Sequence, residues 1–153
     1  MEIIKYKAER LPVKAKGLLP HGPSMIFVDE LIEKTDDKAT VSAIVPRDGI
    51  FVEDGARVHC EYLVELMAQA IAAADGYDAR NKSEQKERIG FVVGVESMHF
   101  LKDVHPGDPL TVKVSKQTEV SNVTFFAGQI LDADDNTIVY GTLKVWRSKN
   151  FSV

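Results

Sequence analysis

The chain has 153 residues, 44% of them hydrophobic and 27% charged, and this balance is typical of one globular domain spanning residues 1–153. Nineteen Lys and Arg against 23 Asp and Glu give a formal net charge of −4, which excludes the overall positive field that non-specific nucleic-acid binding requires. The single cysteine, Cys60, cannot form an intramolecular disulfide, and no apolar run is long enough to span a bilayer. We expect a cytoplasmic protein with no membrane segment and no nucleic-acid partner.

The first third of the chain predicts a β-hairpin and a loop. Two apolar stretches, residues 26–33 and 39–45, are joined by a polar turn at residues 34–38. Residues 46–57 carry charges, two glycines and a proline, so we expect an irregular loop there.

Residues 58–77 predict the one strong helix, because alanines and long apolar side chains dominate this stretch and Gly76 offers a C-terminal stop. The helix is apolar on almost every side, which favours a central, buried position. Residues 78–88 are highly charged and are expected to form a solvated helix end and a loop.

The remainder of the chain alternates as strands do. We expect strands over residues 89–101, 110–120, 123–131 and 137–146, separated by polar turns. Two strands, a buried helix and four more strands predict an α+β fold, in which an antiparallel sheet wraps around one long central helix.

Glu65 is the most informative candidate for chemistry, because it lies in the middle of the most apolar segment. A carboxyl group in apolar surroundings can stay protonated near neutral pH and act as a general acid. Glu61 and Gln69 lie four residues to either side, so the three share one stripe of the helix and are candidates for supporting roles. The alternative is that this stripe is only the polar edge of the helix.

The histidines are the side chains that titrate near neutral pH without help. His59 stands at the start of the predicted helix, where it is either a structural hydrogen-bonding residue or a partner for Glu65. His21 lies in a tight chain reversal and is expected to stabilise that turn. His99 and His105 are expected to be surface or cross-strand residues.

The sequence contains little that predicts a nucleophile or a metal site. Cys60 has only His59 and the helix N-terminus to lower its pKa, so it is a weak candidate nucleophile. No two histidines or cysteines have the spacing of metal ligands, and no nucleotide-binding motif occurs. We expect no metal and no cofactor.

Three blocks of sequence carry a resemblance to a known family. They are residues 19–29 (LPHGPSMIFVD), residues 65–70 (ELMAQA) and residues 90–108, which end in Pro-Gly-Asp. In this order they resemble the hotdog-fold 3-hydroxyacyl-acyl-carrier-protein dehydratases and their thioester-dehydratase relatives, including those of aryl-polyene pathways. The resemblance covers about residues 18–146 and implies a hotdog fold and a hydro-lyase of fatty-acid or polyketide-type synthesis.

The resemblance also implies which residues do the chemistry. Glu65 takes the place of the family's helix carboxylate, which works with a histidine from a loop before the helix, across a dimer interface. The corresponding residues 48–55 (DGIFVEDG) contain no histidine. Dehydration needs a base, an acid and donors for the thioester oxygen. His59 is the nearest candidate base in sequence, and backbone N–H groups near Cys60 are candidate oxyanion donors.

Three functions therefore stay open. The first is a dehydratase that uses Glu65 with a relocated base. The second is a thioesterase, in which Glu65 is the sole general base and activates water. The third is a non-catalytic acyl-binding subunit that pairs with an active hotdog partner.

The resemblance implies two kinds of partner. A second copy of the chain is expected, because hotdog proteins pair their sheets side by side. The substrate is expected to be bound to an acyl carrier protein or to coenzyme A. Because carrier proteins are acidic, four basic residues near the predicted loop, helix entrance and third block are candidates for docking: Arg47, Arg57, Arg88 and Lys102.

Overall fold

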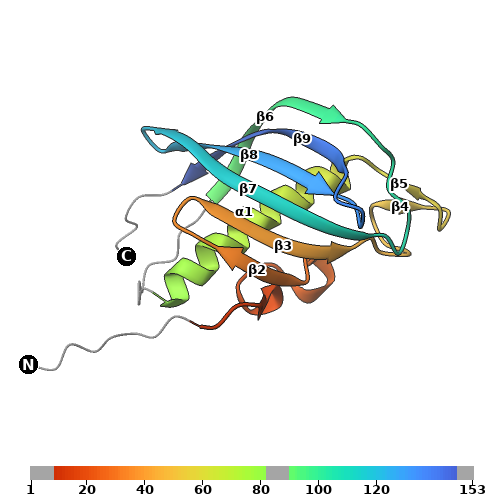
Figure 1. Cartoon of the computed structure of the whole chain (residues 1–153), viewed down its shortest axis with the longest axis horizontal. Helices are drawn as coiled ribbons and strands as arrows, with labels where there is room; N and C mark the ends of the chain where they lie inside the picture. Colours follow the sequence, from red (N-terminus) through yellow and green to blue (C-terminus); the bar gives the residue numbers. More distant parts are fainter. Residues whose placement is uncertain (1–8, 82–89, 148–153) are drawn as a thin grey trace, which may run out of the picture.

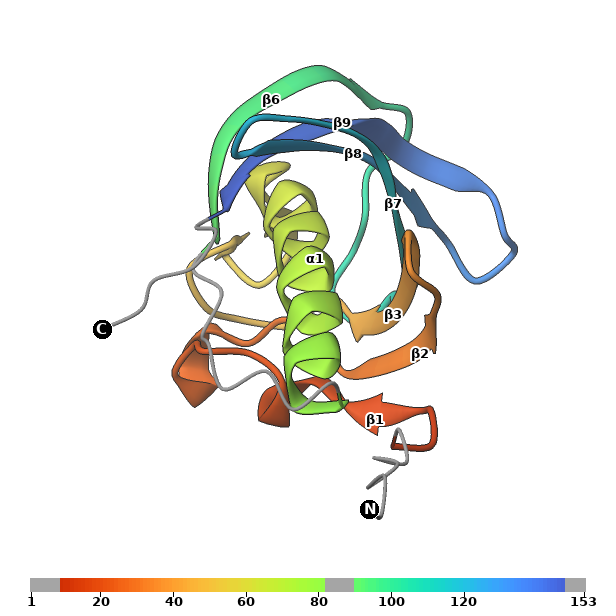
Figure 2. The same ribbon diagram turned by 90° about the vertical axis from the view of Figure 1, so that its left-hand side faces the viewer.

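The computed structural model describes residues 9–81 and 90–147 of the chain (Figure 1). Its main element is a seven-stranded sheet in which all neighbouring strands are antiparallel. Figure 2 shows this sheet curving around one helix, α1 (Glu61–Asn81). The order across the sheet is β1 (Val13–Lys14), β2 (Glu30–Lys34), β3 (Lys38–Ile44), β7 (Pro109–Val120), β8 (Val123–Leu131), β9 (Thr137–Arg147) and β6 (Gly90–Phe100). The predicted α+β hotdog architecture is confirmed.

Alternating side chains build the core between the sheet and α1. In β3, Ala39, Val41 and Ala43 are buried, while the residues between them are not. Val41 lies opposite Val112 of β7, which is also fully buried. This period of two places one apolar face of the sheet against the helix.

The helix approaches the sheet closely because small residues occupy the contact. A Cβ atom added at Gly128 of β8 would lie 2.5 Å from the Met67 sulfur, so a larger residue there would displace the Met67 side chain. On the helix, Ala70 and Ala73 are fully buried. As expected from its composition, α1 therefore buries most of its circumference.

Both ends of the helix differ from the sequence prediction. The helix starts at Glu61 rather than at residue 58, and it continues to Asn81. Gly76 was expected to end it, and this was wrong, since Gly76 lies inside the helix against the Leu18 carbonyl. A Cβ atom there would lie 2.1 Å from that oxygen, so Gly76 serves packing and not termination. Of the expected charged loop, residues 82–88 lie outside the described part of the chain.

The N-terminal segment, residues 9–29, is less regular than predicted. The first strand of the hairpin, β2, begins at Glu30 and not at residue 26. It is preceded by two short 3-10 helices, η1 (Ala15–Gly17) and η2 (Pro23–Met25). The Phe27 N–H donates to the side chain of Gln69 instead of to a neighbouring strand, which explains why the ladder starts later.

The predicted irregular loop contains a small hairpin, β4 (Val52–Glu53) with β5 (Arg57–Val58). The later strands agree with prediction to within about one residue wherever they are described. Their turns also form as expected, with Ser121 and Asp135 in the left-handed conformation that tight turns require. Neither described range contains a helix long and apolar enough to cross a membrane.

Strand β6 lies at the edge of the sheet, where it pairs with β9. Its apolar side chains are unusually exposed: Phe91 and Val93 each show 58% of their surface to solvent. Val92, Val95 and Phe100 are exposed as well. A long edge strand with bare apolar side chains is typical of a surface that pairs with another chain.

Candidate active site

Gln69 links the central helix to the N-terminal segment. Its side chain is fully buried, and its amide nitrogen donates to the Met25 carbonyl at 2.7 Å. Its amide oxygen accepts the Phe27 N–H at 2.8 Å. The same nitrogen donates to Glu65 Oε1 at 3.0 Å, one helical turn away. Gln69 thus satisfies two backbone groups that the late start of β2 leaves without strand partners, and it orients the Glu65 carboxylate.

Glu65 is less buried than the sequence suggested. Its side chain keeps 32% of its surface exposed, so the carboxylate reaches solvent while the neighbouring Leu66 is fully buried. Glu61, expected on the same stripe, is exposed, and its carboxylate accepts a hydrogen bond from the Cys60 thiol at 3.7 Å. The structure therefore brings Gln69, but not Glu61, into contact with Glu65.

His21 is the residue that the sequence reasoning missed. Its Nε2 atom lies 3.9 Å from Glu65 Oε1, and 31% of its side chain is exposed. The sequence predicted only a turn-stabilising role for His21, and it did not predict this proximity to Glu65. Nothing local in the sequence places these two residues together, because their contact depends on how the N-terminal segment packs along α1. The one available signal was the position of His21 in the first resemblance block.

His59 and Cys60 lie before the helix and not within it. Within the chain, the His59 ring faces Glu53, with Nε2 3.5 Å from the carboxylate. The backbone N–H of His59 donates to the Phe51 carbonyl. It does not contact Glu65 of its own chain. Cys60 is exposed, and its backbone N–H has no acceptor among residues 9–81 and 90–147. The helix entrance thus offers at least one N–H donor to a ligand.

An aromatic cluster lies beside the helix entrance. Phe27, Phe51 and Tyr62 pack with ring centroids 5.1 to 6.0 Å apart. The Tyr62 hydroxyl donates to the Ile44 carbonyl at 3.5 Å. Burial, together with the nearby charge of Asp29, raises the pKa of Tyr62 well above its ordinary value. Through Phe51, the loop of residues 48–55 therefore packs against Phe27 and against Tyr62 in the first turn of α1.

The three described basic docking candidates each lie against a different residue. Arg57 lies 3.9 Å from Glu53, and Lys102 lies 3.9 Å from Asp132. The Arg47 guanidinium sits against Gly107, where an added Cβ would lie 3.0 Å from it. Arg88 lies outside the described residues.

A hollow of about 390 Å³ opens near the other end of α1, and Glu65 does not line it. Its principal charges are paired with one another. Lys34 lies 3.1 Å from Asp78, and Arg147 lies 3.0 Å from Asp75. This hollow is therefore separate from the Glu65 site, and these four charged side chains neutralise one another in pairs.

Comparison with known families identifies the one to which the chain belongs. The family described as ApeP-like, ApeP dehydratase, matches residues 13–153. The chain belongs to the ApeP-like dehydratase family. Among curated relatives, the 3-hydroxyacyl-[acyl-carrier-protein] dehydratase FabZ of Oceanobacillus iheyensis is 28% identical over 102 residues, covering 66% of this chain and 73% of FabZ. FabZ of Clostridium perfringens is 29% identical over 99 residues, covering 65% and 71% of the two chains. A thioester-dehydratase type of hydro-lyase is the activity that these relationships support.

Solved structures share the fold. The dehydratase heterocomplex ApeI:P from Xenorhabdus doucetiae contains a chain with a TM-score of 0.78 and 22% identity, covering 93% of this chain and 94% of that one. A hypothetical thioesterase with coenzyme A from Streptococcus pneumoniae has a TM-score of 0.62 at 16% identity, covering 80% and 88%. The same fold is thus found in a dehydratase complex and in a hypothetical thioesterase, and the family membership favours dehydration.

Proposed function

We propose that this protein dehydrates 3-hydroxyacyl thioesters carried on an acyl carrier protein, with Glu65 as a proton-transfer residue. The observation that carries this proposal is the Glu65 carboxylate, held by the buried Gln69 and still open to solvent on the central helix of a dehydratase-family fold. A carboxyl group that is both oriented and accessible is what proton transfer to a substrate requires.

The reaction sets the roles. A base removes the proton on the carbon next to the thioester carbonyl, the bond between carbon 3 and its oxygen breaks, and the hydroxyl leaves as water after accepting a proton. The product is an enoyl thioester. We assign protonation of the leaving hydroxyl to Glu65. The Cys60 N–H at the helix entrance is the proposed donor to the thioester oxygen, where the helix dipole favours negative charge.

The base is proposed to come from a second chain. The exposed apolar strand β6 supports side-by-side pairing with another hotdog chain, either a second copy or a different one. In a homodimer, His59 of the second copy is our candidate base, since His59 faces away from Glu65 within its own chain. In a His59→Ala variant we expect dehydration to be lost, and undiminished dehydration would exclude this role.

The carrier protein is proposed to dock through Arg47, Arg57, Arg88 and Lys102, and a coenzyme A thioester is the alternative substrate form. The single cysteine supports a reducing compartment, and we propose the cytoplasm. Reversing the charges of Arg57 and Lys102 together should weaken carrier binding and reduce its salt dependence. Binding that is unchanged in both respects would remove these two residues from the docking surface.

Product analysis tests the proposed function. The protein is incubated with 3-hydroxyacyl thioesters of several chain lengths, alone and with a candidate hotdog partner, and the products are identified by mass spectrometry. An enoyl thioester that disappears in Glu65→Gln supports the proposal. A free acid indicates a thioesterase, and enoyl formation in the mixture that survives Glu65→Gln indicates a non-catalytic subunit. Either result contradicts the proposal, as does the absence of enoyl thioester in both conditions.

A further inference from the structure

We propose that His21 is a positioning residue for Glu65: its Nε2–H holds carboxylate oxygen Oε1, and this leaves Oε2 as the oxygen that exchanges a proton with the substrate. The inference rests on the proposed dehydration and names a residue for which the sequence indicated only a turn. It is carried by three observations, namely the anchoring of the segment that bears His21, the convergence of two nitrogen atoms on Oε1 and the surroundings of the imidazole.

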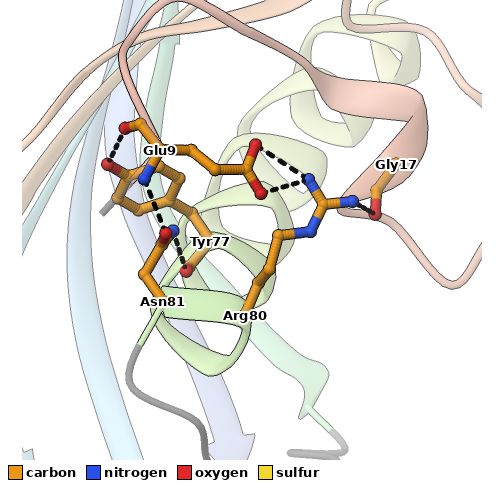
Figure 3. A network of polar contacts seen from close by, with 5 residues as sticks. All are labelled: Glu9, Gly17, Tyr77, Arg80 and Asn81. Atoms are coloured by element: carbon orange, nitrogen blue, oxygen red, sulfur yellow. Dashed lines mark hydrogen bonds and ion pairs between the residues drawn. The ribbon is translucent and has the colours of Figure 1, made fainter. Parts of the chain in front are cut away.

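The N-terminal segment is fastened to α1 along its length. Figure 3 shows the first anchor, where the Arg80 guanidinium donates to the Glu9 carboxylate and also to the Gly17 carbonyl. The Tyr77 hydroxyl donates to the Glu9 carbonyl at 2.7 Å, and the Glu9 N–H donates to Asn81 at 2.7 Å. This network fixes the segment at the C-terminal end of the helix.

Two further anchors lie on either side of His21. Before it, the Leu18 carbonyl rests on Gly76, at a distance that admits no side chain at position 76. After it, Gln69 holds Met25 and Phe27 through two hydrogen bonds. Because the segment is fixed at both points, the place of His21 beside the helix is determined by the fold and not by a free loop.

Two nitrogen atoms converge on one carboxylate oxygen. The Gln69 amide nitrogen lies 3.0 Å from Glu65 Oε1, and the His21 Nε2 lies 3.9 Å from the same atom. Within the described ranges, these polar contacts of the carboxylate all fall on Oε1. The His21 distance is longer than a hydrogen bond, and hydrogen bonds in unliganded active sites commonly tighten when substrate binds. Oε2 is the oxygen that remains open.

The surroundings of the imidazole select its tautomer. His21 Nδ1 is buried and has no hydrogen-bond partner in residues 9–81 and 90–147. A buried N–H without an acceptor is rarer in proteins than a buried acceptor without a donor. The proton of the neutral ring therefore belongs on Nε2, the atom that lies 3.9 Å from Glu65 Oε1 and that donates to this oxygen when the two groups move closer together.

Steady-state kinetics on the active assembly test the role. His21→Ala should lower kcat on the order of 10- to 100-fold, with KM changed by no more than about twofold, because a misoriented carboxylate affects the reaction more than binding. His21→Gln keeps an N–H donor but cannot transfer a proton, so it should recover most of the lost kcat. His105→Ala removes an exposed histidine, 74% of whose side chain is in solvent, and should leave the kinetics unchanged. An unaltered kcat in His21→Ala, or a His21→Gln variant as slow as His21→Ala, would overturn the proposal.

A second measurement separates this inference from the proposed function. If the wild-type protein forms no enoyl thioester, the proposed function fails, and nitrogen-15 NMR of the imidazoles still tests His21. We expect the Nε2–H tautomer for His21 at neutral pH, with a resonance that moves in Glu65→Gln while that of His105 does not. An Nδ1–H tautomer, or a His21 resonance unaffected by Glu65→Gln, would contradict the assignment.

Discussion

The N-terminal segment and strand β6 differ in how they are packed: the first is covered by contacts within the chain, and the second is exposed. Residues 9–29 lie against α1, held by the Glu9 network, the Leu18–Gly76 contact and the hydrogen bonds of Gln69. At β6, the side chains of Phe91 and Val93 stand largely in solvent. A single chain therefore supplies an oriented Glu65, and we propose that a second chain, paired through β6, supplies the base.

Substitutions that break the contacts of the N-terminal segment are therefore expected to lower the free energy of unfolding. Substitutions of exposed side chains in β6 should leave the stability of the isolated chain nearly unchanged. Four substitutions test how strongly these two regions and one turn contribute to stability. They are ordered by their expected effect on the free energy of unfolding.

Gly76→Ala should be the most destabilising change. The new Cβ would lie 2.1 Å from the Leu18 carbonyl oxygen and 3.2 Å from the Leu18 Cα, so backbone must move. We expect a loss of about 3 kcal/mol from overpacking, which exceeds the gain of about 1 kcal/mol from replacing glycine by alanine in a helix. Chemical denaturation measures the net change in the free energy of unfolding. Gly22→Ala is the control, because its Cβ would meet nothing within 4 Å; equal stability of both variants would contradict the tight contact.

Gln69→Leu should come second. It leaves the Phe27 N–H and the Met25 carbonyl, which are only partly buried, without their side-chain partner, so each group costs less than the roughly 1–3 kcal/mol of a fully buried unsatisfied group. We expect a loss of about 1–2 kcal/mol in urea denaturation, together with faster hydrogen exchange at Phe27.

Gln117→Leu is the matched control for that variant. The Gln117 amide is exposed and, among the described residues, its hydrogen bonds go to Ser115 of its own strand, so its loss should cost little. If Gln69→Leu were no worse than Gln117→Leu, the N-terminal segment would not depend on this anchor.

Asp132→Ala should have a smaller and pH-dependent effect. The Asn136 N–H, and after it the Asp134 N–H, donate to the Asp132 carboxylate and hold its pKa below the ordinary value. A lowered pKa in the folded state means that the ionised carboxylate stabilises the fold at pH above about 4, and that this stabilisation disappears as the pH falls through the folded-state pKa.

The difference in melting temperature between wild type and Asp132→Ala should therefore be largest near pH 7 and become smaller as the pH is lowered. Asp134→Ala keeps the backbone donor and is the control. A difference that grows toward low pH would have the wrong sign for this explanation.

Val93→Lys should have the smallest effect on the stability of the isolated chain, within about 0.5 kcal/mol, because the side chain is exposed. It should strongly weaken association, because a lysine on an edge strand opposes pairing. Analytical ultracentrifugation measures it, with Val120→Lys as a control that places the same charge at another exposed valine. Association equal to wild type would remove β6 from the proposed interface.

Much of the fold could be predicted because its signals are local. The alternation in residues 110–120 and 123–131, with Ser121 and Asn122 between them, fixed β7, β8 and their turn almost to the residue. The central helix followed from its composition. Its boundary was wrong because Gly76 is required by a contact with Leu18, which lies 58 residues earlier in the chain, and not by local termination.

The candidate site was predicted only in part for the same reason. Glu65 and Gln69 are one helical turn apart, so their contact follows from helix geometry alone. The approach of His21 to Glu65 depends on the packing of a whole segment, and the sequence carries no periodic signal for that. The roles of His59 and of the basic residues depend on other molecules and remain proposals.

The central claim is that Glu65 performs proton transfer during dehydration. Its most direct test is the rate of enoyl thioester formation from a 3-hydroxyacyl carrier-protein substrate by wild type, Glu65→Gln and, as control, the exposed Glu33→Gln. We predict a fall in kcat of about 100-fold or more for Glu65→Gln, the usual contribution of a general acid or base, with Glu33→Gln like wild type. A Glu65→Gln variant that forms enoyl thioester at the wild-type rate would contradict the claim.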